Sequence, residues 1–173
     1  TDNLIEQIQT LNNIASDFSK FSQPVNEEFS RIDLSSVLSS VAELYQHDEK
    51  TNVRLQSQNG SVHVQGLPDE LRRVFINLVK NAYEAMPDEG GEIILRLYEK
   101  QQHVFVEVED NGSGISEENR PNIFVPNFST KSSGTGLGLA ICKKIIEAHE
   151  GSITFASVEG EGTTFVIKLP ESN

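Results

Sequence analysis

The sequence predicts an α+β fold, a two-layer sandwich in which helices cover one face of a mixed, mostly antiparallel sheet. Segments with helical and with strand periodicity are interleaved, but without the regular strand–helix–strand alternation of a parallel sheet. Hydrophobic residues make up 36% of the 173 residues, enough to form a core. We therefore expect one globular domain with a short appendage.

The appendage is an expected helix over residues 1–23. Its apolar residues recur at alternating spacings of four and three, the pattern of a helix that packs against another helix: Leu4, Ile8, Leu11, Ala15 and Phe18. Pro24 ends this helix, and 24–30 is the expected linker to a domain over 31–173. The partner is expected to be a second copy of the chain. The alternative is a helix that folds back onto its own domain.

Residues 31–173 carry the remaining predicted elements. A second helix begins after Asp33, a plausible N-cap, and carries apolar residues from 34 to 45. A third helix is expected from about 71 to 86, and a fourth from 135 to 149. The expected strands cover 53–55, 61–64, 92–99, 103–109, 152–157 and 163–169.

Composition excludes several classes of protein. The formal net charge is −12, from 14 basic and 26 acidic residues, which disfavours sequence-independent binding to nucleic acid. The single cysteine, Cys142, excludes an internal disulfide and a multi-cysteine zinc site, and its apolar surroundings favour packing over reactivity. No apolar stretch approaches the length of a bilayer span and no signal peptide is evident, so the expected location is cytoplasmic.

Four segments carry candidate chemistry. Asn77 and Asn81 lie four residues apart, on one face of the third helix, where a carboxamide oxygen suits a hard cation that also binds phosphates. Asp110 ends a strand and precedes Gly112 and Gly114, so its carboxylate could accept from the amine of a flat ligand that approaches the backbone closely.

The other two segments are rich in glycine. Gly134, Gly136 and Gly138 lead into the fourth helix, whose free N–H groups would face a phosphate chain. Lys131 and Thr135 could add donors. In the last segment, 160–165, Thr163 opens the final strand and could bond to the edge of a base.

In this order, the four segments resemble the nucleotide-binding domain shared by gyrase B, MutL and the sensor histidine kinases, over about residues 29–170. The resemblance implies the Bergerat ATP-binding fold, with ATP and Mg²⁺ as ligands. It implies that Asn81 binds Mg²⁺, Asp110 the adenine amine, and that 116–134 forms a lid. The residues it assigns to the nucleotide are Asn81, Asp110, Gly112, Gly114, Ile115, Lys131, Thr135, Gly136, Leu137, Gly138 and Thr163.

Asn77 separates the branches of this superfamily. Members that hydrolyse ATP have a glutamate at this position to activate water, whereas an amide cannot accept a proton at neutral pH. Asparagine here, with an F box of Phe124, Pro126 and Phe128, resembles the histidine kinases. The implied catalytic residues are Asn77, Asn81 and Lys131.

The segment 17–24 resembles the second dimerisation helix of nitrogen-regulation-type kinases (NtrB/NtrY-like). The helix that carries the phosphate-accepting histidine in such kinases would precede it. The expected function is transfer of the ATP γ-phosphate to that histidine, in a homodimer, for relay to an aspartate of a response regulator. The fragment alone is not expected to autophosphorylate.

Two other functions fit the same segments less well. An anti-sigma-type serine kinase shares the nucleotide fold but would not need the N-terminal helix. A non-catalytic scaffold would be expected to lose some of the four segments. His47 has acidic neighbours like an acceptor histidine, but no proline follows it. Glu84 stands where related domains often have a basic residue, so either Lys80, Lys131 or Lys143 compensates or the affinity for ATP is modest.

Overall fold

The computed structural model describes residues 28–45, 50–58, 60–129 and 136–172. A five-stranded sheet has the order β2-β4-β5-β7-β6, and a separate two-stranded sheet joins β1 to β3. The elements are β1 Ser30–Asp33, α2 Leu34–Glu43, β2 Thr51–Ser57, β3 His63–Gly66, α3 Pro68–Glu84, β4 Gly91–Lys100, β5 His103–Asp110, η1 Arg120–Asn122, α4 Gly138–Ala148, β6 Ser152–Val158 and β7 Gly162–Pro170. The predicted helix over 1–23, His47, Lys131 and Thr135 lie outside the described residues.

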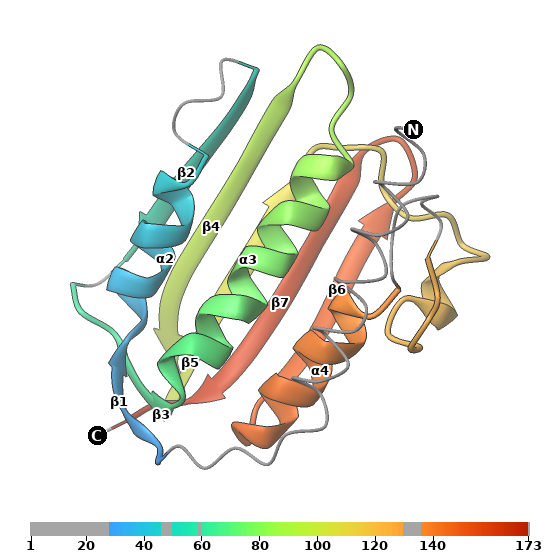
Figure 1. The fold of residues 1–173 in the computed structure, drawn as a ribbon. Helices are drawn as coiled ribbons and strands as arrows, with labels where there is room; N and C mark the ends of the chain where they lie inside the picture. The colour runs from blue at the N-terminus through green and yellow to red at the C-terminus, as the bar shows by residue number, and fades with distance from the viewer. Residues whose placement is uncertain (1–27, 46–49, 59, 130–135, 173) are drawn as a thin grey trace, which may run out of the picture.

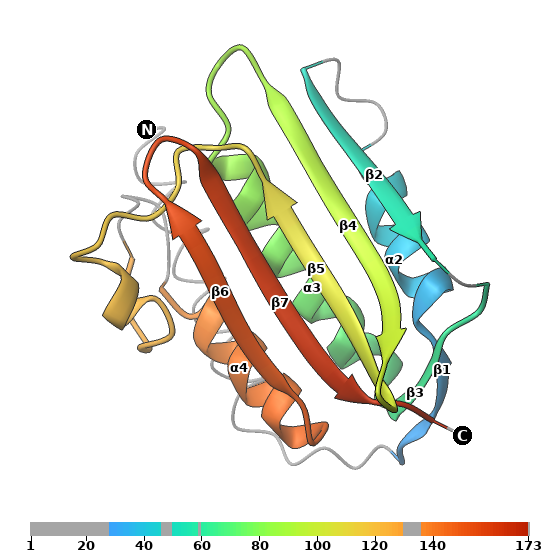
Figure 2. The same ribbon diagram turned by 180° about the vertical axis from the view of Figure 1, so that it is seen from behind.

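The predicted two-layer architecture is confirmed. Helices α2, α3 and α4 lie on one face of the sheet, and Figure 2 shows its other face without a helix. Strand β2 pairs with β4 in parallel, while β4–β5, β5–β7 and β7–β6 are antiparallel. Because alternate side chains of a strand point to opposite faces, Val104, Val106 and Val108 of β5 are buried against the helices. The sheet is therefore mixed and mostly antiparallel.

Helices α2 and α3 bury most of the apolar residues that their periodicity placed on one face, but the predicted Leu44 follows the end of α2 and is 58% exposed. α3 buries Leu71, Val74, Phe75, Leu78, Val79 and Ala82. α4 packs beside it and buries Ile141, Cys142, Ile145 and Ile146. None of the helices among the described residues is long and apolar enough to cross a membrane.

Asp33 is the N-cap of α2, as predicted, and its Oδ1 accepts from the backbone N–H of Ser35 at 2.9 Å. The strand β1 directly before it was not predicted. Its four residues pair with β3, with Ser30 opposite Gly66. A strand this short contains too few alternations to stand out in a sequence, and its pairing with β3 is decided by tertiary contacts.

Candidate functional site

The described candidate residues come from four segments. The C-terminal half of α3, the end of β5 and the β6–β7 turn lie in the upper half of Figure 1, and α4 begins below them, at about mid-height. These elements are far apart in sequence. The antiparallel pairing of β5 with β7, and the packing of α3 against α4, bring them together.

Asp110 and Thr163 lie side by side on neighbouring strands. They are partners in the β5–β7 register, and each is only 6% exposed. One carboxylate oxygen of Asp110 accepts from the backbone N–H of Gly112 at 2.9 Å. A buried carboxylate that carries a hydrogen bond from its own loop is held in one orientation.

Gly112 and Gly114 are required by the chain's own backbone. A Cβ on Gly112 would stand 2.6 Å from the carbonyl oxygen of Ala85, and one on Gly114 would stand 2.1 Å from that of Val158. Gly114 also has a φ of +67°. We expected these glycines to make room for a ligand, but packing of the loop between α3 and the β6–β7 turn already explains them.

Ser157 is a site residue that the sequence reading missed. Its hydroxyl accepts from the N–H of Ile115 at 2.8 Å and donates to the carbonyl of Gly162 at 3.0 Å. Since its one proton goes to Gly162, the hydroxyl of Thr163, 2.9 Å away, is the donor to Ser157. Ser157 therefore joins the glycine loop to the strand of Thr163. The sequence does contain a signal for this role, because Ser157 is a polar residue on the same strand face as Ile153 and Phe155.

The beginning of α4 is built differently from that of α2. Its N-cap, Leu137, makes no side-chain capping bond, and the N–H of Ile141 is bonded to the carbonyl of Leu137. The N–H groups of the first turn of a helix are suited to an anion. Among the described residues, the atoms nearest to a Cβ on Gly138 would be those of the Asn77 side chain, at 3.9 Å. Steric crowding by the backbone explains why positions 112 and 114 are glycines, but it does not explain the glycine at 138.

Asn77 lies at the interface of α3 and α4. Besides facing Gly138, its side chain hydrogen-bonds to the thiol of Cys142. Burial raises the pKa of Cys142 to about 12, against the opposing effect of the bond from Asn77. The thiol is therefore protonated at neutral pH, which agrees with the predicted packing role. Asn81 lies one helical turn further along α3 and is partly exposed.

Two of the three lysines that were expected to compensate for Glu84 are paired with carboxylates. Lys80 lies 3.8 Å from Glu84 itself, and Lys143 lies 3.9 Å from Glu147. These pairs are solvent-exposed, so they contribute little and can rearrange.

The F box packs against the sheet. Phe124 makes edge contacts with the rings of Phe155 and Phe165, at centroid distances of 5.9 and 6.4 Å. At the end of this segment, the N–H of Asn127 donates to the carbonyl of Gly136 at 3.0 Å. This bond joins the residues on either side of 128–135, which contains the last part of the predicted lid, and Gly136 lies two residues before α4.

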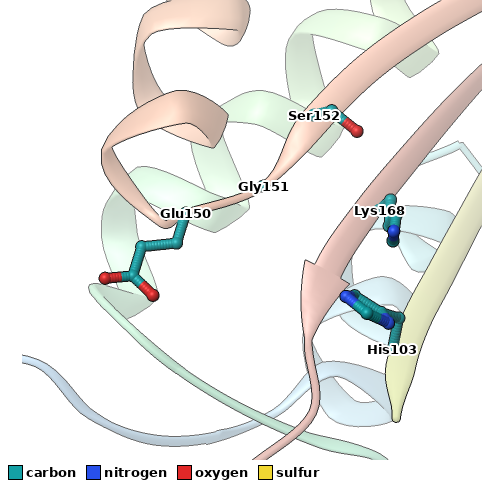
Figure 3. A pocket seen from close by; sticks show the side chains of 5 residues that line it. All are labelled: His103, Glu150, Gly151, Ser152 and Lys168. Atoms are coloured by element: carbon teal, nitrogen blue, oxygen red, sulfur yellow. The ribbon is translucent and has the colours of Figure 1, made fainter. Parts of the chain in front are cut away.

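A separate hollow of about 130 Å³ lies where β6 begins and β7 ends. Figure 3 shows its lining residues, with the carboxylate of Glu150 turned away from His103 and Lys168. It contains none of the predicted site residues. The described residues include no group of three or more His, Cys, Asp or Glu side chains that could hold a metal ion.

Residues 66–173 match the family model of the histidine kinase-, DNA gyrase B- and HSP90-like ATPases, and the chain belongs to this family. Within the family, it is the ATP-binding catalytic domain of a two-component sensor histidine kinase, with the α+β Bergerat-type fold.

Curated relatives support this assignment. Sensor histidine kinase ZraS of Escherichia coli (strain K12) is 32% identical over 96% of this chain, and sporulation kinase E of Bacillus subtilis (strain 168) is 45% identical over 60% of it. The chain covers 36% of ZraS and 14% of sporulation kinase E, so it spans well under half of these relatives.

Solved structures show the same fold. The catalytic domain of histidine kinase ThkA is 34% identical, with a TM-score of 0.75 over 84% of this chain and 97% of that one. ThkA in complex with the response regulator protein TrrA is 27% identical, with a TM-score of 0.81 over 99% of this chain and 50% of that one.

Proposed function

We propose that this domain presents the γ-phosphate of ATP to a histidine on a dimerisation helix, and that the phosphate then passes to an aspartate of a response regulator. The observation that carries the proposal is the amide of Asn77, which faces the beginning of α4. At this position an amide leaves water without a general base, so the nucleophile has to come from another segment.

The proposed roles follow the geometry. Asp110, held by Gly112, accepts from the adenine amine, and Thr163 lies beside it at the base edge. The first turn of α4, with Gly136, Leu137 and Gly138, binds the phosphates through backbone N–H groups. Gly112, Gly114 and Ile115 form the wall of the base pocket. Lys131 and Thr135, which lie outside the described residues, are proposed to add donors to the phosphates.

The donor set at α3 fits Mg²⁺. This ion keeps several waters and takes only one or two protein ligands besides phosphate oxygens, so a site without an acidic cluster among the described residues suits it. The carboxamide of Asn81 is the proposed ligand. When bound, Mg²⁺ neutralises charge on the phosphates, which matters in a chain with a net charge of −12.

Partners and location are proposed on the same basis. The segment 1–23 would form a homodimer through its apolar face, and the assembly of ThkA with TrrA supports a response regulator as the second partner. The response regulator would accept the phosphate in the compartment that supplies ATP. This favours a cytoplasmic location. The nitrogen-regulation subtype remains a proposal, since the relatives compared are ZraS and sporulation kinases.

Calorimetric titration of this fragment with Mg·ATP tests the nucleotide and nucleophile assignments. We expect heat of binding without continuing heat from hydrolysis. No binding would favour the scaffold function, and sustained turnover would show that Asn77 does not prevent activation of water.

In the full-length kinase, Asn81→Ala should remove Mg²⁺-dependent formation of phosphohistidine. Unchanged transfer in that variant would take Asn81 out of the metal site.

A further inference from the structure

His149, at the C-terminal end of α4, joins three separate segments of the chain. Its ring is only 4% exposed. The N–H of Leu67 donates to Nε2 at 3.0 Å, so Nε2 has to be an acceptor. The ring proton is therefore on Nδ1, which donates to the carbonyl of Ile145 at 2.7 Å. The two bonds fix the neutral imidazole between α4 and the connection from β3 to α3.

The backbone of Gly66 lies directly against this ring. A Cβ on Gly66 would stand 2.5 Å from Cδ2 and 2.8 Å from Nε2 of His149. Gly66 ends β3, and it pairs with Ser30, the first residue of β1. The imidazole is thus packed directly against the place where the chain enters the domain.

Phe29 stacks on His149 at this place. The ring centroids are 4.8 Å apart and the planes differ by 21°. Phe29 is 48% exposed and does not belong to the buried core. It is the residue directly before β1, where the chain coming from 1–27 enters the domain. An exposed aromatic ring at this position is better explained by docking of the incoming chain than by burial.

The other end of α4 is the proposed phosphate site. The helix is 11 residues long, so it spans about 16 Å from Gly138 to Ala148. Figure 1 shows α4 running from about mid-height, where it begins, to the lower end of the molecule, where β1 also lies. One rigid helix therefore connects the place where phosphate is proposed to bind with the residue on which Phe29 is stacked.

We propose that the Phe29–His149 stack is a positioning contact for phosphoryl transfer. It fixes, relative to α4, the point at which the chain enters the domain at Phe29. This limits where the γ-phosphate can lie relative to an acceptor histidine on the segment before Phe29, and transfer requires a narrow range of such geometries. The inference rests on the proposed function. Phe29 and His149 touch neither the proposed nucleotide site nor the reacting atoms, so they are positioning residues.

The test compares Phe29 variants of the full-length kinase at saturating Mg·ATP. Phe29→Ala removes the ring, Phe29→Leu keeps apolar bulk without a ring, and Phe29→Tyr keeps the stack. Stacked aromatic pairs shift an equilibrium by about twofold to tenfold. We expect kcat for phosphohistidine formation to fall by that factor in the Ala and Leu variants, with the KM for ATP unchanged, and to be restored in the Tyr variant.

Leu44→Ala is the matched control, because Leu44 is also a large exposed apolar residue, at 58%, but lies at the end of α2. It should leave kcat unchanged. Equal kcat in wild type and Phe29→Ala overturns the inference, as does a rise in kcat or a loss of ATP affinity in the Phe29 variants. A wild-type enzyme that forms no phosphohistidine overturns the proposed function itself, and the inference with it.

Discussion

Within the described part of the chain, the side chain of Asn77 on α3 is the nearest group to the position where a Cβ on Gly138 of α4 would stand, at a distance of 3.9 Å. At Gly112, Gly114 and Gly136, such a Cβ would lie within 2.6 Å of backbone atoms. Gly138 therefore differs from these glycines, because the described part of the chain leaves the space beside it open. We assign that space to the phosphates of ATP.

Gly138→Ala is expected to separate binding from stability. Alanine is the better residue in a helix, so the free energy of unfolding should stay the same or rise by up to about 1 kcal/mol. Affinity for Mg·ATP should fall more than about tenfold, because the methyl group keeps a phosphate from the N–H groups of the first turn. Calorimetry and urea denaturation measure the two effects. Gly60→Ala, where a Cβ would meet none of the described atoms within 4 Å, is the control. Unchanged affinity in Gly138→Ala would place the phosphates elsewhere.

Asp110→Asn is expected to lose nucleotide affinity while it keeps the fold. The amide retains one oxygen for the N–H of Gly112, but presents an NH₂ donor to an adenine amine. Loss of a hydrogen bond to a charged acceptor should weaken binding by about tenfold to a hundredfold. Asp110→Ala should in addition lower the free energy of unfolding by about 1–3 kcal/mol, because the buried N–H of Gly112 loses its partner. Full affinity in Asp110→Asn would refute the adenine assignment.

Ser157→Ala tests the connection between the glycine loop and β7. The substitution removes the partner of the Ile115 N–H and two further bonds, to Gly162 and Thr163. We expect a loss of about 1–3 kcal/mol in the free energy of unfolding, together with weaker nucleotide binding. Ser157→Thr keeps the hydroxyl and should retain most of both. A melting temperature and ATP affinity equal to wild type in Ser157→Ala would contradict this role.

Asp33 should make part of the stability depend on pH. Burial raises the pKa of its carboxyl, but hydrogen bonds from Ser36 and Ser35 outweigh burial, and the net pKa lies below 3.8. A lowered folded pKa means that the contribution is complete above about pH 4 and is lost as the pH falls through the folded value. Asp33→Ala should cost about 1 kcal/mol at pH 7, and this difference should shrink on acidification. Asn caps the helix without a charge. The difference in free energy of unfolding between Asp33→Asn and Asp33→Ala should therefore be the same at every pH.

Glu150 occupies a position that favours glycine. It follows the C-cap His149 with a φ of +57°, and the N–H groups of Glu150 and Gly151 bond to the carbonyls of Glu147 and Ile146. This is a Schellman motif with a glutamate at its left-handed residue. Glu150→Gly should raise the free energy of unfolding by about 1 kcal/mol. Glu150→Ala removes the same charge without relieving the backbone, so an equal gain in both variants would assign the effect to charge instead.

The sequence predicted best where a local pattern is strong. The apolar spacing of α3 and the alternation of β5 each repeat over several turns or strand residues, and both elements were found near their predicted bounds. Prediction failed where the pattern is short. β1 has only four residues, so its sequence looks like a loop until its partner strand is known. Ser157 is a single polar residue in β6, so it looks like an ordinary strand residue until its hydrogen-bond partners are known.

The sequence by itself determined the class of fold, the strand residues that face the helices, and the residue types available to bind a nucleotide. Periodicity and side-chain chemistry are local properties, so a sequence is enough to read them. The tertiary structure decided which glycines leave space, because only packing shows that Gly112 and Gly114 face backbone while Gly138 does not. It also decided the role of His149, whose two ring nitrogens bond to segments 82 and 4 residues away in sequence. The contact 82 residues away depends on how the helices and strands pack, which no local pattern encodes.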